Sequence, residues 1–175
     1  MLRYCFVLFL ALAAGVAPAA NPPTPSEVLG FTPGDDYKLA DHAQITKYFQ
    51  VLAAAAPDRM RLLEIGRSEL GKPIWMAVIS APENLQQLER YRRAGETLAL
   101  GRAATDQQAA ELSSQGRAIV WIDSGLHASE VACAQHSPEL AYRIVAGAGP
   151  EIEKIRRQVI LLQVPSINPD GLDWI

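Results

Sequence analysis

The amino-acid sequence predicts an α/β fold in which helices flank a mixed, mostly parallel sheet. Apolar runs at 60–66 and 73–80, joined by a glycine-containing turn, predict an antiparallel hairpin. Two further apolar runs, 118–123 and 159–164, are separated by helical patterns, and this order implies a crossover between parallel neighbours. With 175 residues, 49% of them hydrophobic, the chain can bury one substantial core.

Composition excludes several classes of protein. The apolar content is too high for a disordered or fibrous chain. The 16 basic and 19 acidic residues give a formal net charge of -3, and the basic residues form no block. Nucleic acid is therefore not an expected partner.

Residues 1–19 have the pattern of a secretory signal peptide. Arg3 gives a basic start, 4–16 is apolar, and Ala17-Pro18-Ala19 resembles a cleavage site. The apolar run of 13 residues is shorter than the roughly 17 that a spanning helix needs, although an uncleaved membrane anchor is the alternative. We therefore expect a secreted or periplasmic protein with no stable membrane insertion after cleavage.

Cysteine usage adds one expectation. Cleavage would remove Cys5 and leave Cys133 as the single cysteine, so no internal disulfide could form. Because Cys133 lies in an apolar helical segment, we expect it to be a small buried residue.

The segments before the hairpin differ in character. Residues 20–40 are rich in proline and polar residues and predict an extended lead-in without a core. Asp41 then caps a predicted helix that Pro57 ends. The apolar residues of this helix keep a helical spacing: Ile45, Phe49, Leu52 and Ala56.

The rest of the chain alternates helical and strand patterns. Residues 82–116 are expected to be helical in pieces, with a capping box at 105–108 and no assigned function. The run 118–123 predicts a strand covered on both faces. A helix at 130–146 should be kinked or split by Pro138, and Pro150 should open a short helix before the buried strand 159–164.

His127 and Glu130 are the predicted metal ligands. They follow the strand 118–123, with His127 in the loop and Glu130 in the first helical turn. Residues three apart in a helix have Cβ atoms roughly 5 to 6 Å from each other, which lets both side chains reach one ion. The helix N-terminus also favours the ionised carboxylate that binds a metal.

This pattern has alternatives. A His-x-x-Glu match alone is weak, and His127 could be a loop histidine bonded to backbone. The chain contains a second match, His136 with Glu139, but it lies inside a helix and not at a strand exit, where sites in open α/β sheets gather. We therefore interpret His136, like His42, as a partly buried helix residue.

A second polar strand exit supports the metal site. Residues 164–171 follow the strand 159–164 and contain Asn168-Pro169-Asp170-Gly171. Taken alone, this segment is an ordinary turn. Two such exits in one small sheet favour the rim of a catalytic cleft.

Three ordered motifs resemble the zinc carboxypeptidase family, the carboxypeptidase A-like metallopeptidases. They are the hairpin 65–74, the strand and turn 121–130, and the loop 168–171. The resemblance implies a three-layer α/β/α fold, of which residues 41–175 would be the N-terminal portion of the catalytic domain, incomplete in this chain.

The resemblance further implies a secreted zinc-dependent metallocarboxypeptidase that hydrolyses C-terminal bonds of peptide or protein substrates. His127 and Glu130 would be two of three protein ligands of a catalytic Zn2+. The third ligand, substrate-binding arginines, a tyrosine and the glutamate general base are expected beyond Ile175, so the chain itself should be inactive. Ser129 stands where the best-known members have arginine, which leaves substrate contacts there in question.

Two other functions stay open. One is a zinc deacylase or amidase that acts on small N-acyl amino acids or cell-wall peptides. The other is a non-catalytic binding module that keeps the fold and lacks the base. A carboxypeptidase differs from the deacylase in needing arginine to bind the free C-terminal carboxylate, and absence of the late glutamate would favour the binding module.

Overall fold

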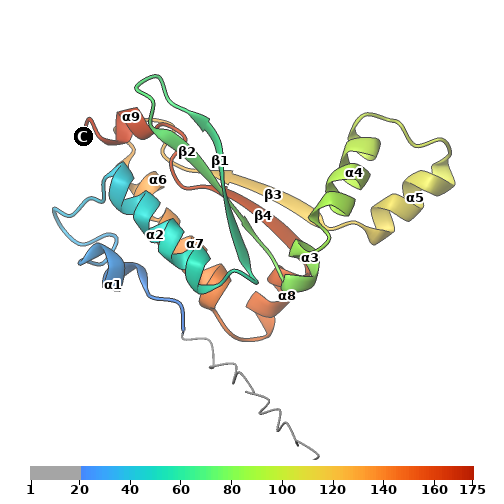
Figure 1. The fold of residues 1–175 in the computed structure, drawn as a ribbon, viewed down its shortest axis with the longest axis horizontal. Helices are drawn as coiled ribbons and strands as arrows, with labels where there is room; N and C mark the ends of the chain where they lie inside the picture. Colours follow the sequence, from blue (N-terminus) through green and yellow to red (C-terminus); the bar gives the residue numbers. More distant parts are fainter. Residues whose placement is uncertain (1–20) are drawn as a thin grey trace, which may run out of the picture.

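A four-stranded mixed sheet lies at the centre of the fold in the computed structural model, which describes residues 21–175 (Figure 1). The strands are β1 (Met60–Arg67), β2 (Pro73–Ile79), β3 (Ala118–Asp123) and β4 (Val159–Val164). Their order is β1-β2-β4-β3, with β3 and β4 parallel and the other two pairings antiparallel. The mixed sheet is thus confirmed, but it is not mostly parallel in this part of the protein, because β2 pairs antiparallel with β4 as well as with β1. The predicted signal peptide, 1–19, lies outside the described residues.

Helices pack on both faces of this sheet. They are α1 (Pro25–Leu29), α2 (His42–Ala55), α3 (Pro82–Leu85), α4 (Leu88–Ala99), α5 (Asp106–Gln115), α6 (Val131–Gln135), α7 (Ser137–Ala146), α8 (Pro150–Gln158) and α9 (Pro169–Leu172). As expected, the helix around Pro138 is split, into α6 and α7. None of the helices in residues 21–175 is long and apolar enough to cross a membrane.

Local signals explain α2. The Asp41 carboxylate accepts a hydrogen bond from the Gln44 amide (2.7 Å), and the Gln44 side chain accepts one from the Asp41 amide (3.0 Å). This reciprocal capping satisfies amide groups that have no partner within the helix. The apolar side of the helix is buried, as its spacing predicted.

The expected extended lead-in at 20–40 is wrong in part, because it contains α1. The Thr24 hydroxyl and the Glu27 carboxylate form a capping box at the start of this helix. Leu29 is buried in the main core, and Phe31 packs against it. The capping box therefore outweighs the surrounding prolines, one of which occupies the first helical turn where its missing amide costs nothing.

The two faces of the sheet carry different cores. On one face, residues of α2 and α7 such as Phe49 and Val145 pack with Leu161 of β4. On the other, Tyr91 of α4 packs with Val78 of β2 and Ile160 of β4. Successive residues of a strand point to opposite faces, which is why β4 contributes to both cores.

Strand β3 departs from its expectation. The sequence predicted a strand covered on both faces, yet Ile119 and Trp121 are each 50% exposed and Val120 is 39% exposed. The physical reason is that β3 lies at the edge of the sheet in the described part of the chain, with β4 beside it. Strand β4 lies between β2 and β3 and is largely buried, as predicted.

Residues 82–116 form α3, α4 and α5, in agreement with the expected helical pieces. Thr105 caps α5 through a bond from the Gln108 amide (3.1 Å), but the Gln108 side chain bonds the amide of Ala104 (2.6 Å), one residue earlier than in a capping box. Figure 1 shows α4 and α5 projecting beyond the end of the sheet. Helix α5 leads into the start of β3, whereas the predicted metal ligands follow the end of that strand.

Candidate metal site at the rim of the sheet

The loops that leave β3 and β4 meet at one edge of the sheet. Because the two strands are parallel, their carboxyl ends lie together. The Ser124 amide donates to the Val164 carbonyl (3.0 Å), and the Ile167 amide donates to the Ser124 carbonyl (2.9 Å). The two polar strand exits found in the sequence therefore form one rim.

His127 and Glu130 face each other on this rim. The His127 Nδ1 atom lies 3.0 Å from Glu130 Oε2, and the side chains are 66% and 55% exposed. Helix α6 begins one residue later than expected, so Glu130 directly precedes it, and the backbone angles of Glu130 are not helical. The Glu130 carboxylate makes no capping bond to the helix. Both this carboxylate and the His127 imidazole are exposed and therefore accessible to an ion from solvent.

The spacing of these two atoms suits a metal ion. At the usual Zn–N and Zn–O distances and a tetrahedral angle, two ligand atoms lie about 3.3 Å apart. The observed 3.0 Å requires only a small adjustment. Within residues 21–175 no group of three histidine, cysteine, aspartate or glutamate side chains gathers around an ion-sized space, so the described chain offers a pair of ligands.

The other two histidines lie in different environments. His136, at the junction of α6 and α7, is exposed and not partly buried, because its side chain points out beside the Ala132 carbonyl. His42 is buried at the start of α2, and this burial lowers its pKa although the Asp173 carboxylate opposes the effect. Among the described residues, His127 is the histidine that is paired with a carboxylate. Cys133 is half-buried in α6.

Asn168 links the loop after β4 to the loop that carries His127. Its Oδ1 atom accepts a bond from the Gly171 amide (3.0 Å), and its Nδ2 atom donates to the carbonyl of Leu126 (3.1 Å). A Cβ atom on Gly171 would lie 3.0 Å from the Cβ of Ala128. The start of α9 therefore packs closely against the residues on either side of His127.

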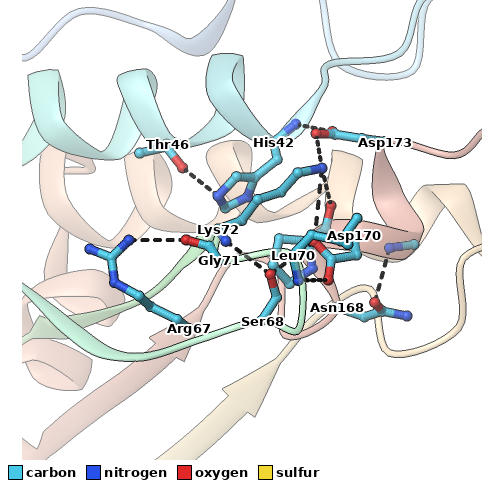
Figure 2. Close-up of polar contacts among 12 residues, drawn as sticks. His42, Thr46, Arg67, Ser68, Leu70, Gly71, Lys72, Asn168, Asp170 and Asp173 are labelled. Atoms are coloured by element: carbon cyan, nitrogen blue, oxygen red, sulfur yellow. Dashed lines mark hydrogen bonds and ion pairs between the residues drawn. The ribbon is translucent and has the colours of Figure 1, made fainter.

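Asp170 connects the same loop to the β1–β2 turn (Figure 2). Its Oδ1 atom accepts a bond from the Ser68 hydroxyl (2.8 Å), and its Oδ2 atom accepts one from the Leu70 amide (3.1 Å). Ser68 Oγ in turn accepts a bond from the Lys72 amide (3.0 Å). The hairpin and the loop 168–171, found as separate motifs in the sequence, are thus in direct contact.

Lys72 and Asp173 strengthen this contact. The Lys72 ammonium forms an ion pair with Asp173 and donates to the Pro169 carbonyl (3.3 Å). Asp173 also accepts a bond from the His42 amide (2.8 Å). Burial raises the pKa of Asp173, but the bonds from Lys72 and His42 outweigh burial and hold the pKa below its usual value.

Most of the chain matches one protein family. The family model described as zinc carboxypeptidase matches residues 45–175, which include the hairpin, both strand exits and the rim. The chain belongs to the zinc carboxypeptidase family. No curated protein matches the chain.

Solved structures that share the fold of the described residues include two carboxypeptidases, and this chain matches a part of each. Thrombin activatable fibrinolysis inhibitor is 15% identical with a TM-score of 0.57, over 85% of this chain and 33% of its own. Carboxypeptidase A from Helicoverpa armigera is 18% identical with a TM-score of 0.56, over 84% and 31%. A metallo-carboxypeptidase from Burkholderia cenocepacia is 18% identical with a TM-score of 0.51, over 74% and 27%. The chain spans about a third of the length of these structures.

Family membership and the rim geometry bear on different questions. The match places the chain in the zinc carboxypeptidase family, which is a family of hydrolases that act on peptide bonds. His127 and Glu130 lie inside the matched residues, and their role as metal ligands stays a prediction. The sequence placed Asp170 in a polar strand exit at the rim, but it indicated neither the bond between Asp170 and Ser68 nor the ion pair between Asp173 and Lys72. These contacts join residues about a hundred positions apart.

Proposed function

We propose that the complete protein containing this chain is a zinc-dependent metallocarboxypeptidase, and that His127 and Glu130 are two of its Zn2+ ligands. The observation that carries the proposal is the imidazole and carboxylate pair, 3.0 Å apart at the carboxyl ends of two parallel strands. The zinc carboxypeptidase match includes both residues. A peptide or protein with a free C-terminus is the proposed substrate.

The described residues account for part of this chemistry. When bound, a zinc ion supplies Lewis-acid chemistry that polarises a carbonyl and acidifies water. His127 and Glu130 would hold the ion from one side, and their exposure leaves the opposite side open for substrate and for a further ligand. Two protein ligands hold zinc weakly, so residues 21–175 alone should not hydrolyse peptides.

We also propose export of the protein. The proposal depends on the signal-peptide pattern of residues 1–19. The mature protein would then act in a secreted or periplasmic location. N-terminal sequencing of the exported protein would test this, and a mature N-terminus near Ala20 is the expected result.

The metal site is tested by zinc analysis of the complete gene product. Wild-type protein should contain roughly one Zn2+ per molecule after dialysis against buffer without metal. His127→Ala and Glu130→Ala should each lower this content strongly, whereas His136→Ala is the matched control and should retain it. Unchanged zinc content in both site variants would contradict the assignment.

Substrate assays separate the three candidate functions. A metallocarboxypeptidase should cleave a peptide with a free C-terminal carboxylate and fail on the same peptide with an amidated C-terminus. A deacylase or amidase should instead accept small N-acyl amino acids. Binding of peptides without hydrolysis by the zinc-loaded protein would favour the binding module.

A further inference from the structure

The contacts between the β1–β2 turn and the loop after β4 indicate how the proposed metal ligands are held in place. We propose that Asp170 is a positioning residue for His127 and Glu130. It fastens the loop after β4 to the hairpin, and that loop holds the segment carrying the two ligands. This inference rests on the proposed function.

The first step is the attachment of Asp170 to the hairpin. Both of its carboxylate oxygens are used, one by the Ser68 hydroxyl and one by the Leu70 amide, and the side chain is only 18% exposed. Hydrogen bonds to a carboxylate are roughly twice as strong as those between neutral groups. The amide of Lys72 donates to Ser68 Oγ, which leaves the hydroxyl proton free to point at Asp170.

The hairpin turn is a firm anchor for this attachment. Within the turn, the Ser68 amide donates to the Lys72 carbonyl (2.9 Å), and the Gly71 amide donates to the Ser68 carbonyl (2.9 Å). Gly71 has a φ of 81°, a left-handed conformation that glycine adopts without a steric penalty. The turn is therefore closed by its own bonds, and Asp170 binds to a surface that is already ordered.

The second step leads from Asp170 to the metal ligands. Its neighbour Gly171 donates its amide to Asn168, and Asn168 donates to the carbonyl of Leu126, the residue before His127. Gly171 also lies against Ala128, the residue after His127. Two contacts from the loop after β4 therefore bracket the histidine.

The ligand segment needs such support because it has little structure of its own. Residues 124–129 belong to no helix or strand, and Leu126 is 61% exposed. Gly125 has a φ of 66°, so the chain turns sharply as it leaves β3. Metal ligands must be held within about 0.5 Å of their productive positions, and outer contacts usually supply that precision.

A purely structural role for Asp170 makes a different prediction. In that case, Asp170→Ala would lower the stability of the fold but leave the zinc affinity of the folded molecules unchanged. A positioning role requires the affinity to fall further than the loss of stability explains. Asp41 is a suitable control, because its carboxylate caps α2 and, within the described residues, has no hydrogen bond or ion pair to the rim loops.

The experiment measures the zinc dissociation constant of the complete gene product by chelator competition, together with its melting temperature. Asp170→Ala should raise the dissociation constant about tenfold or more, the effect typical of lost outer contacts at metal sites. Asp41→Ala should lower the melting temperature and leave the dissociation constant unchanged. An unchanged dissociation constant in Asp170→Ala would overturn the proposal.

Substitutions at Ser68 provide a milder test, which also decides the question if Asp170→Ala does not fold. Ser68→Ala removes the donor to Asp170 and should weaken zinc binding in the same direction, whereas Ser68→Thr keeps the hydroxyl and should restore it. Asp170→Ala also removes the bond from the Leu70 amide, so Ser68→Ala should have the smaller effect, and adding it to Asp170→Ala should weaken zinc binding little further. If Ser68→Ala leaves zinc binding unchanged, Asp170 does not act through its bond to Ser68.

The outcomes distinguish this inference from the function on which it rests. If wild-type protein binds no zinc, or if His127→Ala binds it as well as wild type, the proposed function fails. If His127→Ala loses zinc and the Ser68 and Asp170 variants keep it, only the positioning role is wrong.

Discussion

At the scale of single residues, the close approach between α9 and the loop after β3 depends on Gly171. A Cβ atom there would lie 2.5 Å from Asn168 Nδ2 and 3.0 Å from Ala128 Cβ. Gly171→Ala should therefore displace the Asn168 side chain from the Leu126 carbonyl and destabilise the protein by about 1–3 kcal/mol, as overpacking does. Urea unfolding of the complete gene product would measure this change.

Gly66→Ala is the matched control for that substitution. Gly66 also lies outside the left-handed region, and a Cβ there would meet no atom within 4 Å. The control should change stability by much less than Gly171→Ala. Equal effects would mean that the contact with Asn168 does not limit this position.

The residues of the site differ in how far the sequence could predict them. The sequence could predict that His127 and Glu130 lie close together because only three positions separate them, and a single turn brings such side chains within reach of each other. The bond between Ser68 and Asp170 joins residues 102 positions apart, and neither residue type nor spacing indicates it. Such a contact can be predicted only once the strand order is known, because that order places the hairpin beside the loop after β4.

At the scale of elements, N-terminal caps should matter in proportion to what their helices bury. Asp41 caps α2, which contributes several fully buried side chains to the main core, whereas Thr105 caps α5, which buries none. Asp41→Ala should cost about 0.5–2 kcal/mol of the free energy of unfolding. Thr105→Ala should cost less, because α5 can fray without opening the core.

Denaturant titration of the two variants would measure this difference. Each substitution removes one side-chain acceptor for a helix amide, so the local chemistry is matched. Equal losses of stability would show that α5 unfolds together with the core and not separately from it.

The elements that sequence analysis placed correctly are those with a strong local signal. Asp41 with Pro57 marks the limits of α2, and Pro138 divides α6 from α7. Helix α1 was not predicted because its segment is rich in proline, although Thr24 and Glu27 carry the capping-box pattern. For β3, an apolar run predicts a strand but does not say whether a neighbour covers it, and that depends on the rest of the sheet.

At the scale of the whole molecule, one topological feature assembles the site. The chain crosses from β3 to β4 through α6, α7 and α8, and the two strands end at the same edge of the sheet. The hairpin strand β2 then pairs with β4 and brings its turn next to the loop after β4. The parallel pairing of β3 with β4 thus places the proposed metal ligands, and the antiparallel pairing of β2 with β4 brings the hairpin turn that supports them.

The same topology leaves β3 as an edge strand, which leads to a prediction about the isolated chain. The strand presents Ile119, Val120 and Trp121 with substantial exposure and has unpaired backbone groups on its outer side in the described structure. Exposed apolar edges recruit strands from other molecules. Residues 21–175 expressed alone should therefore be poorly soluble, and Trp121→Lys should increase the soluble fraction.

Leu100→Lys separates the effect of the edge from the effect of added charge. Leu100 is 55% exposed at the end of α4, away from the sheet edge, and the substitution adds the same charge. If aggregation proceeds through β3, light scattering should fall for Trp121→Lys and stay near the original level for Leu100→Lys. A soluble monomer of residues 21–175 that melts cooperatively would contradict the prediction, because β3 would then be tolerated as a free edge.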